Sequence, residues 1–451
     1  MNTSRSRTQI EAPARRRTPL DLLMNSGLGK MLRGIGIAPR PTSGESLLDL
    51  ADALLSLRGR ASGPALASAF FDLYEASDPA ARQEFLGKIH DLHPSDASAI
   101  DKAIAAWSEH RDENAARALH EATESPSQKL IRLLNLAPQG TERLIAMRED
   151  LLAAPKDGGT GLAAFDRDLE DAFTDWFNAG FLELRRISWD SPAQLLERII
   201  RYEAVHEIRG WDDLRRRVEP IDRRCYGFFH PQMMDDPLIF VEVALTTELP
   251  SAIHQIITEE RETVQPRDAS CAIFYSINNC RNGLRGIPFG NYLIKRVVGL
   301  LKEELPELSC FATLSPVPGF ARWLAKEPEG ADVPAAPELR KLAAKYLVTA
   351  KGKGGQPLDP VARFHLGNGA RLEAIHANAD LSPNGQRQAH GVMVNYVYDL
   401  GEIEANHFAL TELGTVATSK AVQSLVDDPE PKEPKSKGGR KSGTAKDPVP
   451  A

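Results

Sequence analysis

The spacing of apolar residues changes near Val205, and no single architecture accounts for both sides of that point. Before it, apolar residues recur three and four positions apart, as in LLDLADALLSL at 47–57, which is the spacing of one helix face. After it, short β-branched and apolar runs bounded by turn residues are typical of strands. The chain has 451 residues, more than the ~250–300 that one core usually accommodates. We therefore predict a multidomain protein.

The first region reads as helical almost throughout, from Ser46 to about Val205. We predict an all-α bundle of roughly eight helices over 46–205, with one long helical stretch through residues 165–187. Residues 1–45 contain several Arg and Ser residues and no apolar stretch of the kind found in secretory signals. We expect a flexible N-terminus there, with a mitochondrial transit peptide as the alternative.

Four apolar runs in the second region, residues 206–426, are predicted strands. They are LIFVEVALT at 238–246, CAIFYSI at 271–277, LSCFATLS at 308–315 and GVMVNYVYDL at 391–400. Helical segments alternate with them, so the fold class expected for this region is α/β or α+β. Residues 427–451 are rich in Pro, Gly and Lys and are predicted to be disordered.

Charge and cysteine usage argue against several classes of protein. The formal net charge is −7, whereas a nucleic-acid-binding protein is expected to be basic. The four cysteines form no CxxC pair, which argues against a zinc site and fits a reducing compartment. No apolar run approaches the ~20 residues of a membrane helix. We therefore expect a cytoplasmic protein with no nucleic-acid or membrane partner.

A glycine-containing loop follows the second predicted strand and opens into a predicted helix at Asn291–Leu305. Glycines let backbone N–H groups approach a ligand, and a helix N-terminus favours phosphate. Arg281 and Arg285 would add positive charge. No GK[ST] follows, and the glycine spacing is not that of a dinucleotide-binding fingerprint. The spacing RGIPFG at 285–290 resembles the pyrophosphate loop of GNAT-type acyltransferases; an ordinary strand-to-helix turn is the alternative.

Two further segments place polar side chains at element ends. Ser315 ends the third predicted strand and precedes a helix; strand ends line the crevice in α/β folds, although a serine before a helix is commonly its cap. Asp-Pro at 359–360 and Asn-Gly at 368–369 are predicted to begin and end a short helix. His365 then lies near the helix C-terminus, whose dipole favours imidazolium. A structural histidine is the alternative reading.

A set of strings in this sequence resembles the malonyl-CoA decarboxylase family, and the resemblance extends from the helical region to about Val426. The strings are RRCYGFFH, LIFVEVALT, AIFYSI, GLRGIPFGNYLIKRVV, FATLSPVPGFARWL, DPVARFHLGNGA and VMVNYVY. Several such strings in order are far more specific than any one loop. The resemblance implies a helical oligomerisation domain, homotetramers, and a GNAT-like catalytic domain that binds acyl-CoA.

The same resemblance implies roles for individual residues. The catalytic serine and histidine fall on Ser315 and His365. A tyrosine that supports the histidine falls on Tyr398, and a further histidine needed for activity falls on His230. Animal members have a glutamate in the substrate-binding loop where this chain has proline, so no role for that carboxylate is implied. The loop, which holds the coenzyme A pyrophosphate, falls on Arg285, Gly286, Ile287, Pro288, Phe289, Gly290 and Asn291.

The implied reaction converts malonyl-CoA to acetyl-CoA and carbon dioxide, in malonate or fatty acid metabolism. The thioester itself delocalises the enolate charge, so no metal or organic cofactor is expected. Ser315 would hydrogen-bond the malonyl carboxylate or thioester oxygen, and Tyr398 would orient His365. The histidine would protonate the enolate carbon directly or through the serine, a step typically worth about 10²–10⁴-fold. The alternatives are an acyl-CoA N-acyltransferase and a non-enzymatic coenzyme A-binding scaffold.

Overall fold

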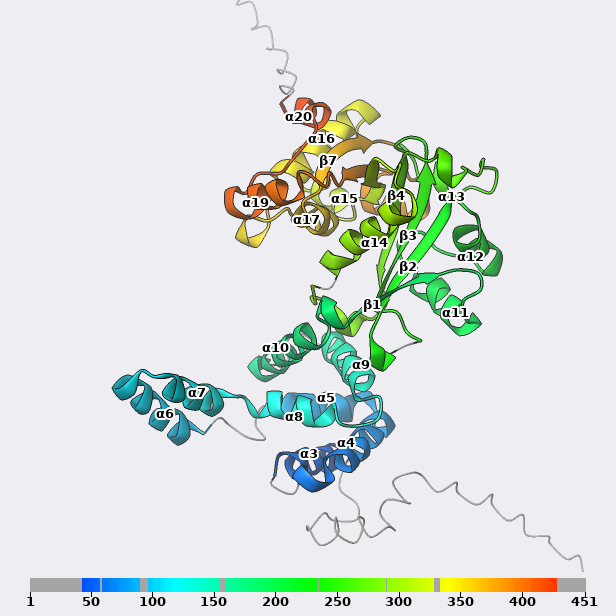
Figure 1. The fold of residues 1–451 in the computed structure, drawn as a ribbon. Coiled ribbons are helices and arrows are strands. Elements are labelled where there is room, and N and C mark those ends of the chain that lie inside the picture. The colour runs from blue at the N-terminus through cyan, green and yellow to red at the C-terminus, as the bar shows by residue number, and fades with distance from the viewer. Residues whose placement is uncertain are drawn as a thin grey trace, which may run out of the picture. The chain divides into compact units, whose positions relative to one another are not determined.

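The computed structural model of the protein describes residues 43–56, 59–89, 96–154, 159–233, 235–288, 290–327 and 333–427 (Figure 1). Almost all of the predicted flexible N-terminus and disordered tail lie outside these residues. The described chain forms a helical region followed by a mixed α/β region, as predicted. No helix in this part of the chain is long and apolar enough to cross a membrane.

Eight helices make up the described helical region before the first strand. Side-chain caps define several of their starts, because a helix leaves its first N–H groups unsatisfied. Asp96 accepts a hydrogen bond from the Ala99 N–H, and Ser125 forms a capping box with Gln128. The helices are α3 (Ser43–Leu55), α4 (Gly59–Ala76), α5 (Pro79–Lys88), α6 (Ala97–His110), α7 (Glu113–Thr123), α8 (Pro126–Leu134), α9 (Gly140–Ala153) and α10 (Gly159–Trp176).

The predicted long helix through residues 165–187 is wrong in its last part. Helix α10 ends at Trp176, and Glu183–Ile187 forms strand β1. This polar segment pairs antiparallel with strand β2 (Arg223–Phe229), and Ile187 enters a buried apolar cluster. Pairing with the distant strand β2 therefore outweighs the helical pattern of the local sequence, since whether a segment forms a strand depends strongly on the strands beside it.

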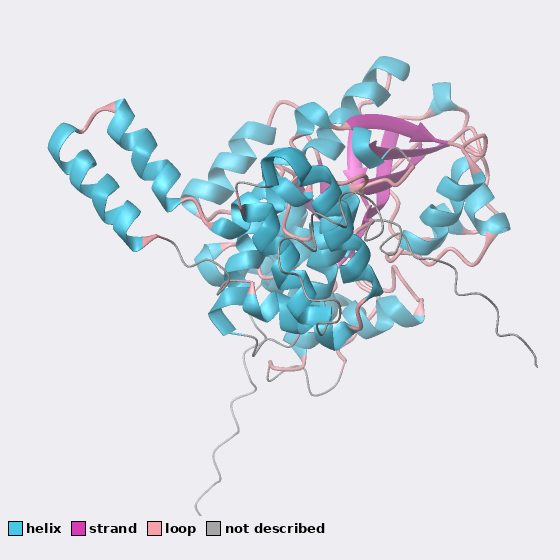
Figure 2. Ribbon diagram, turned by 90° about the horizontal axis from the view of Figure 1, so that it is seen from below, coloured by secondary structure: helices cyan, strands magenta, loops and turns pink. Residues whose placement is uncertain are grey.

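The strands form one eight-stranded sheet in the order β1-β2-β3-β4-β5-β8-β6, with β7 paired to β8. Figure 2 shows the strands in magenta and the helices in cyan. Strands β4 and β5 are parallel, with Cys271 opposite Cys310, and β5 pairs antiparallel with β8. All four predicted strands are confirmed, although the third breaks after Thr313 so that Ser315 lies on the separate strand β6. The remaining strands are β3 (Ile239–Thr246), β4 (Cys271–Asn279), β5 (Cys310–Thr313), β6 (Ser315–Pro316), β7 (Arg371–His376) and β8 (Met393–Val397).

The chain divides into two compact units. The first comprises Met1–Ala244, Gln265–Arg267 and Ser276–Pro306, and the second comprises Leu245–Val264, Asp268–Tyr275 and Glu307–Ala451. The predicted domain limits stay a prediction. The helices of the α/β region are α11 (Ala193–Tyr202), α12 (Trp211–Val218), α13 (His254–Ile257), α14 (Gly290–Glu304), α15 (Phe320–Leu324), α16 (Ala336–Thr349), α17 (Pro360–Gly367), α18 (Pro383–Ala389), α19 (Ile403–Leu413) and α20 (Lys420–Asp427).

An apolar cluster in the first unit joins helices α11 and α12 to strands β1, β2 and β3. Cys225 on β2 is fully buried in this cluster, and burial raises the pKa of its thiol well above the ordinary value. A thiol with these two properties is unreactive in the folded protein.

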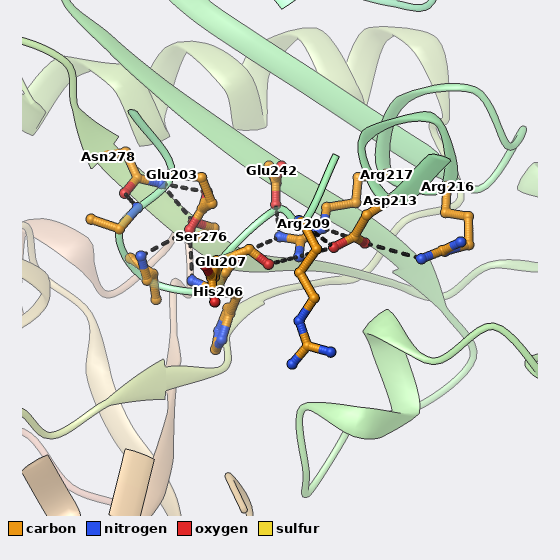
Figure 3. Close-up of polar contacts among 12 residues, drawn as sticks. Glu203, His206, Glu207, Arg209, Asp213, Arg216, Arg217, Glu242, Ser276 and Asn278 are labelled. Carbon is orange, nitrogen blue, oxygen red and sulfur yellow. Dashed lines mark hydrogen bonds and ion pairs between the residues drawn. The ribbon is translucent and has the colours of Figure 1, made fainter. Parts of the chain in front are cut away.

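A buried polar cluster fixes the connection between α11 and α12 (Figure 3). The Glu203 carboxylate accepts hydrogen bonds from Ser276 Oγ at 2.7 Å, from Asn278 Nδ2 at 2.6 Å and from backbone N–H groups that follow it. Arg217 donates to the carbonyl of His206 at 2.7 Å and lies 3.4 Å from the Glu242 carboxylate. The protein itself supplies these hydrogen-bond donors, as is usual for buried polar groups. We therefore interpret the cluster as structural, holding the connection between α11 and α12 in place.

Candidate active site

Ser315, His365 and Tyr398 meet in the interior of the second unit. Ser315 begins β6, His365 lies in the last turn of α17, and Tyr398 follows β8. The His365 Nε2 lies 3.2 Å from Ser315 Oγ, and its Nδ1 lies 2.8 Å from the Tyr398 hydroxyl. All three side chains are at most 5% exposed. The structure thus brings together three of the four residues for which the resemblance implied catalytic roles.

Hydrogen-bond directions around Ser315 assign the protons of His365. The Ser315 hydroxyl donates to Thr313 Oγ1 at 2.8 Å. Its oxygen is then free to accept from His365 Nε2, which makes Nε2 the protonated nitrogen. Nδ1 consequently accepts from the Tyr398 hydroxyl. The chain of donors runs from tyrosine to histidine to serine to threonine.

Local sequence sets the helix that carries His365. The Asp359 carboxylate caps α17 by accepting from the Val361 and Ala362 N–H groups at 2.9 and 3.0 Å. Pro360 occupies the first turn, and the helix ends at Gly367 with Gly369 in the left-handed region at φ +82°. The predicted limits of this helix are confirmed. A short helix held at both ends gives the histidine a defined direction.

Asp359 also connects this helix to the segment that follows Ser315. Its second carboxylate oxygen accepts from the Gly319 N–H at 3.1 Å and from the Tyr346 hydroxyl at 3.4 Å. Gly319 precedes α15, and this helix carries no side-chain cap. Ser315 is therefore not a helix cap, and its hydroxyl is committed to Thr313 and His365.

The prediction that the helix C-terminus favours an imidazolium at His365 is wrong. Burial lowers the pKa of His365 to about 3. Removal from water disfavours the charged form by several pKa units, whereas a helix terminus typically contributes about 0.3–1 kcal/mol. In the described part of the chain, no carboxylate hydrogen-bonds the ring, and its nitrogens hydrogen-bond only hydroxyl groups. Desolvation therefore dominates, and the histidine is neutral at physiological pH.

Two residues of this cluster had not been assigned from the sequence. Thr313 lies two positions before Ser315, and its Oγ1 also accepts from the Tyr396 N–H at 3.2 Å. The Tyr396 ring stacks on the His365 ring with centroids 4.8 Å apart. In extended chain, residues two positions apart lie on the same face. Thr313 has this spacing from Ser315, and Tyr396 has it from Tyr398. This spacing is the one sequence signal that could have identified Thr313 and Tyr396.

The predicted phosphate loop lies in the first unit, between β4 and α14. Arg285 and Pro288 are exposed and Ile287 is buried, whereas Gly290 opens the fifteen-residue helix. The predicted arrangement of strand, loop and helix is therefore confirmed. Gly286 adopts φ +94°, a conformation that favours glycine. Phe289 falls outside the described residues, and Asn291 belongs to the first turn of α14.

Arg281 does not supply the free positive charge predicted for it. Its guanidinium lies 2.9 Å from Asp236 and 3.2 Å from Glu149. These ion pairs neutralise the side chain within the fold. The Arg285 side chain makes no hydrogen bond or ion pair with other described residues, so its exposed guanidinium carries the available charge of the loop.

His230 lies in the first unit, directly after β2. Its Nδ1 accepts from the Gln232 N–H at 3.2 Å, and its ring packs edge-on against Phe177 with centroids 5.1 Å apart. Burial lowers the pKa of this histidine. These contacts hold the ring in place, and the catalytic role implied for His230 stays a prediction. Within the described chain, no group of three or more His, Cys, Asp or Glu side chains is arranged to hold a metal ion.

Two family models match this chain. That of the malonyl-CoA decarboxylase C-terminal domain matches residues 180–336 and 325–436, and that of the N-terminal domain of the same family matches residues 93–177. The matched segments include Ser315, His365, Tyr398 and the loop. Together the matches cover most of the described chain.

Solved structures and curated relatives agree with the family models. The chain is 48% identical to malonyl-CoA decarboxylase from Rhodopseudomonas palustris, with a TM-score of 0.78 over 85% of this chain and 100% of that one. It is 47% identical to malonyl-CoA decarboxylase from Agrobacterium vitis, with a TM-score of 0.79 over 84% of this chain and 99% of that one. The mitochondrial malonyl-CoA decarboxylase of Rattus norvegicus is 35% identical over 64% of this chain and 68% of its own length, and that of Anser anser anser is 36% identical over 64% and 66%. The chain therefore belongs to the malonyl-CoA decarboxylase family.

Proposed function

We propose that the protein carries out the reaction of its family, the conversion of malonyl-CoA to acetyl-CoA and carbon dioxide, at the Ser315–His365 pair. The observation that carries this proposal is a neutral histidine, buried among hydroxyl groups, whose Nε2 faces Ser315 Oγ at 3.2 Å. A buried donor chain of this kind suits charge that develops on an enolate, because preorganised donors in a dry site stabilise it strongly.

The serine and histidine would act on different atoms of the substrate. When substrate binds, the Ser315 hydroxyl would turn away from Thr313 Oγ1 and donate to the thioester oxygen, on which charge accumulates as carbon dioxide leaves. A donor of this kind contributes ~3–4 kcal/mol to the transition state. His365 supports the serine through Nε2, and Tyr398 fixes the tautomer through Nδ1.

The reaction consumes one proton, and the low pKa of His365 suggests how it arrives. In the free enzyme the imidazole is neutral. The malonyl carboxylate brings a negative charge into the same buried space, and an opposite charge nearby raises the pKa of a histidine. The proton would therefore bind to His365 together with the substrate. After carbon dioxide leaves, the imidazolium gives that proton to the enolate carbon, directly or through Ser315, and becomes neutral again.

The loop at residues 285–291 would hold the coenzyme A part of the substrate, as expected of a GNAT-like domain. Arg285 has an exposed guanidinium without a protein partner among the described residues, and α14 begins at Gly290. Helix N-termini bind phosphate through free N–H groups. We further propose that the protein forms a homotetramer in the cytoplasm.

Turnover of purified protein on malonyl-CoA tests the proposed reaction. Acetyl-CoA and carbon dioxide should appear in equal amounts. One proton should be taken up from a lightly buffered solution per turnover, before the carbon dioxide hydrates to bicarbonate and releases a proton. His365→Asn should lower kcat about 10²–10⁴-fold, the usual contribution of a general acid. Product formation by this variant at the wild-type rate would refute the assignment, and acyl transfer to an added amine would favour the acyltransferase.

A further inference from the structure

A buried arginine of the helical region holds the backbone of the proposed phosphate loop. Arg148 on α9 is 2% exposed, and its Nη1 donates to the carbonyl oxygens of Gly283 at 3.0 Å and Arg285 at 2.9 Å. Its Nε donates to Asp166 on α10 at 2.8 Å, and Nη2 lies 3.4 Å from Glu170. The guanidinium therefore links two carboxylates of α10 to two carbonyls of the loop.

Further contacts from α9 and α10 reach the same loop. The Glu149 carboxylate accepts from the Gly283 N–H at 3.3 Å. A side chain at Gly283 would overlap the backbone carbonyl of Ile145, and a Cβ at Gly286 would lie 2.7 Å from the Glu170 carboxylate. Close packing against the Ile145 backbone therefore requires glycine at 283, and the positive φ of +94° favours glycine at 286.

These contacts also fix the backbone of Arg285, whose side chain would meet the phosphates. Its own carbonyl is held by Arg148, and its N–H donates to the Asn282 carbonyl at 3.0 Å. With both backbone groups fixed, the exposed guanidinium projects from a defined point. Arginine binds phosphate through a planar fork of donors, so the direction of the side chain affects binding.

We propose that Arg148 is a positioning residue for coenzyme A binding, acting from the helical region through the carbonyls of Gly283 and Arg285. The inference rests on the proposed function, because it takes the loop as the site of the coenzyme A phosphates. It makes the helical region part of the substrate-binding apparatus of the same chain. Arg148 itself does not touch the substrate.

The test compares a substrate with phosphates and one without. Arg148→Lys keeps the positive charge but loses the forked contact to the two carbonyls. We expect KM for malonyl-CoA to rise about tenfold with kcat near the wild-type value, since displacements of about 1 Å cost up to about 10²-fold. For the malonyl thioester of N-acetylcysteamine, which lacks the phosphates, kcat/KM should stay within twofold of wild type.

Arg143→Lys is the matched control. Arg143 lies on the same helix and also pairs with two carboxylates, Asp72 at 2.8 Å and Glu75 at 2.6 Å, but these belong to α4. It should leave the KM for malonyl-CoA unchanged. If Arg148→Lys does not fold, Asp166→Asn, which removes the charge that orients Arg148, should raise the same KM about threefold.

Equal losses on both substrates, or an unchanged KM for malonyl-CoA, would overturn the role of Arg148. A wild-type protein that turns over neither thioester would instead refute the proposed function, so the two failures are distinguishable. Binding of coenzyme A and of pantetheine to each variant, measured by calorimetry, gives a readout independent of turnover. Only the affinity for coenzyme A should fall in Arg148→Lys.

Discussion

Acidification should destabilise the second unit through His365. The pKa of this histidine falls from 6.5 to about 3 because the ring is buried. The unfolded chain therefore binds a proton below pH 6.5 that the folded chain does not, and stability is lost as pH falls through that value. At pH 5 the loss is about 2 kcal/mol relative to pH 8. Any folded pKa below about 4 gives this same loss at pH 5, so the prediction does not depend on the depth of the shift.

Urea unfolding of the wild-type protein and of His365→Asn at pH 8 and pH 5 measures this loss. Trp323 is the only tryptophan within the sequence of the second unit, so the fluorine resonance of a fluorotryptophan there reports that unit. The wild type should lose about 2 kcal/mol more than the variant between the two pH values. Parallel losses in both proteins would show that His365 titrates normally and would refute the burial argument.

Three further predictions concern other parts of the molecule. Tyr398→Phe removes the donor to His365 Nδ1 and should lower kcat about tenfold to a hundredfold with little change in KM; initial rates within twofold of wild type would contradict this. Arg217→Met removes a cation 3.4 Å from the buried Glu242 carboxylate and the donors to the His206 and Glu207 carbonyls. It should cost about 3–5 kcal/mol in the free energy of unfolding, so a loss below about 1 kcal/mol in urea would be evidence against it. Cys225 should react with a thiol reagent only on unfolding, and mass spectrometry that finds it labelled in the native protein would count against its burial.

The strands illustrate what the sequence could and could not predict. The runs at 238–246 and 271–277 are apolar and β-branched, and both form central strands, β3 and β4. Segment ELRRI at 183–187 is mostly polar, and it becomes a strand because β2 offers a hydrogen-bonding partner 38 to 46 residues further along the chain. A pattern that extends over a few residues predicts burial, whereas pairing with a distant segment is decided by the fold.

The candidate site divides in a similar way. The capping residues at 359–360 and 368–369 predicted the helix that carries His365. This was possible because a helix cap depends only on residues next to it in the sequence. The charge of that histidine was predicted wrongly, since the helix terminus is visible in the sequence and the surrounding burial is not. The family resemblance pointed to Ser315 and Tyr398. Only the folded structure shows the distances from these residues to His365.

A buried neutral histidine and an anionic substrate are suited to each other. A permanently charged imidazolium in this apolar setting would need a carboxylate partner, because an unpaired buried charge is costly. Such a carboxylate would compete with the malonyl carboxylate for the same positive charge. Among the described residues, the ring nitrogens of His365 hydrogen-bond only the hydroxyl groups of Ser315 and Tyr398. In the proposed mechanism the substrate would therefore provide the counter-charge. In the proposed mechanism, loss of carbon dioxide would move that negative charge from the carboxylate to the enolate, beside the imidazolium of His365. Transfer of the proton to the enolate carbon would then remove both charges from the buried site, where unpaired charge is costly.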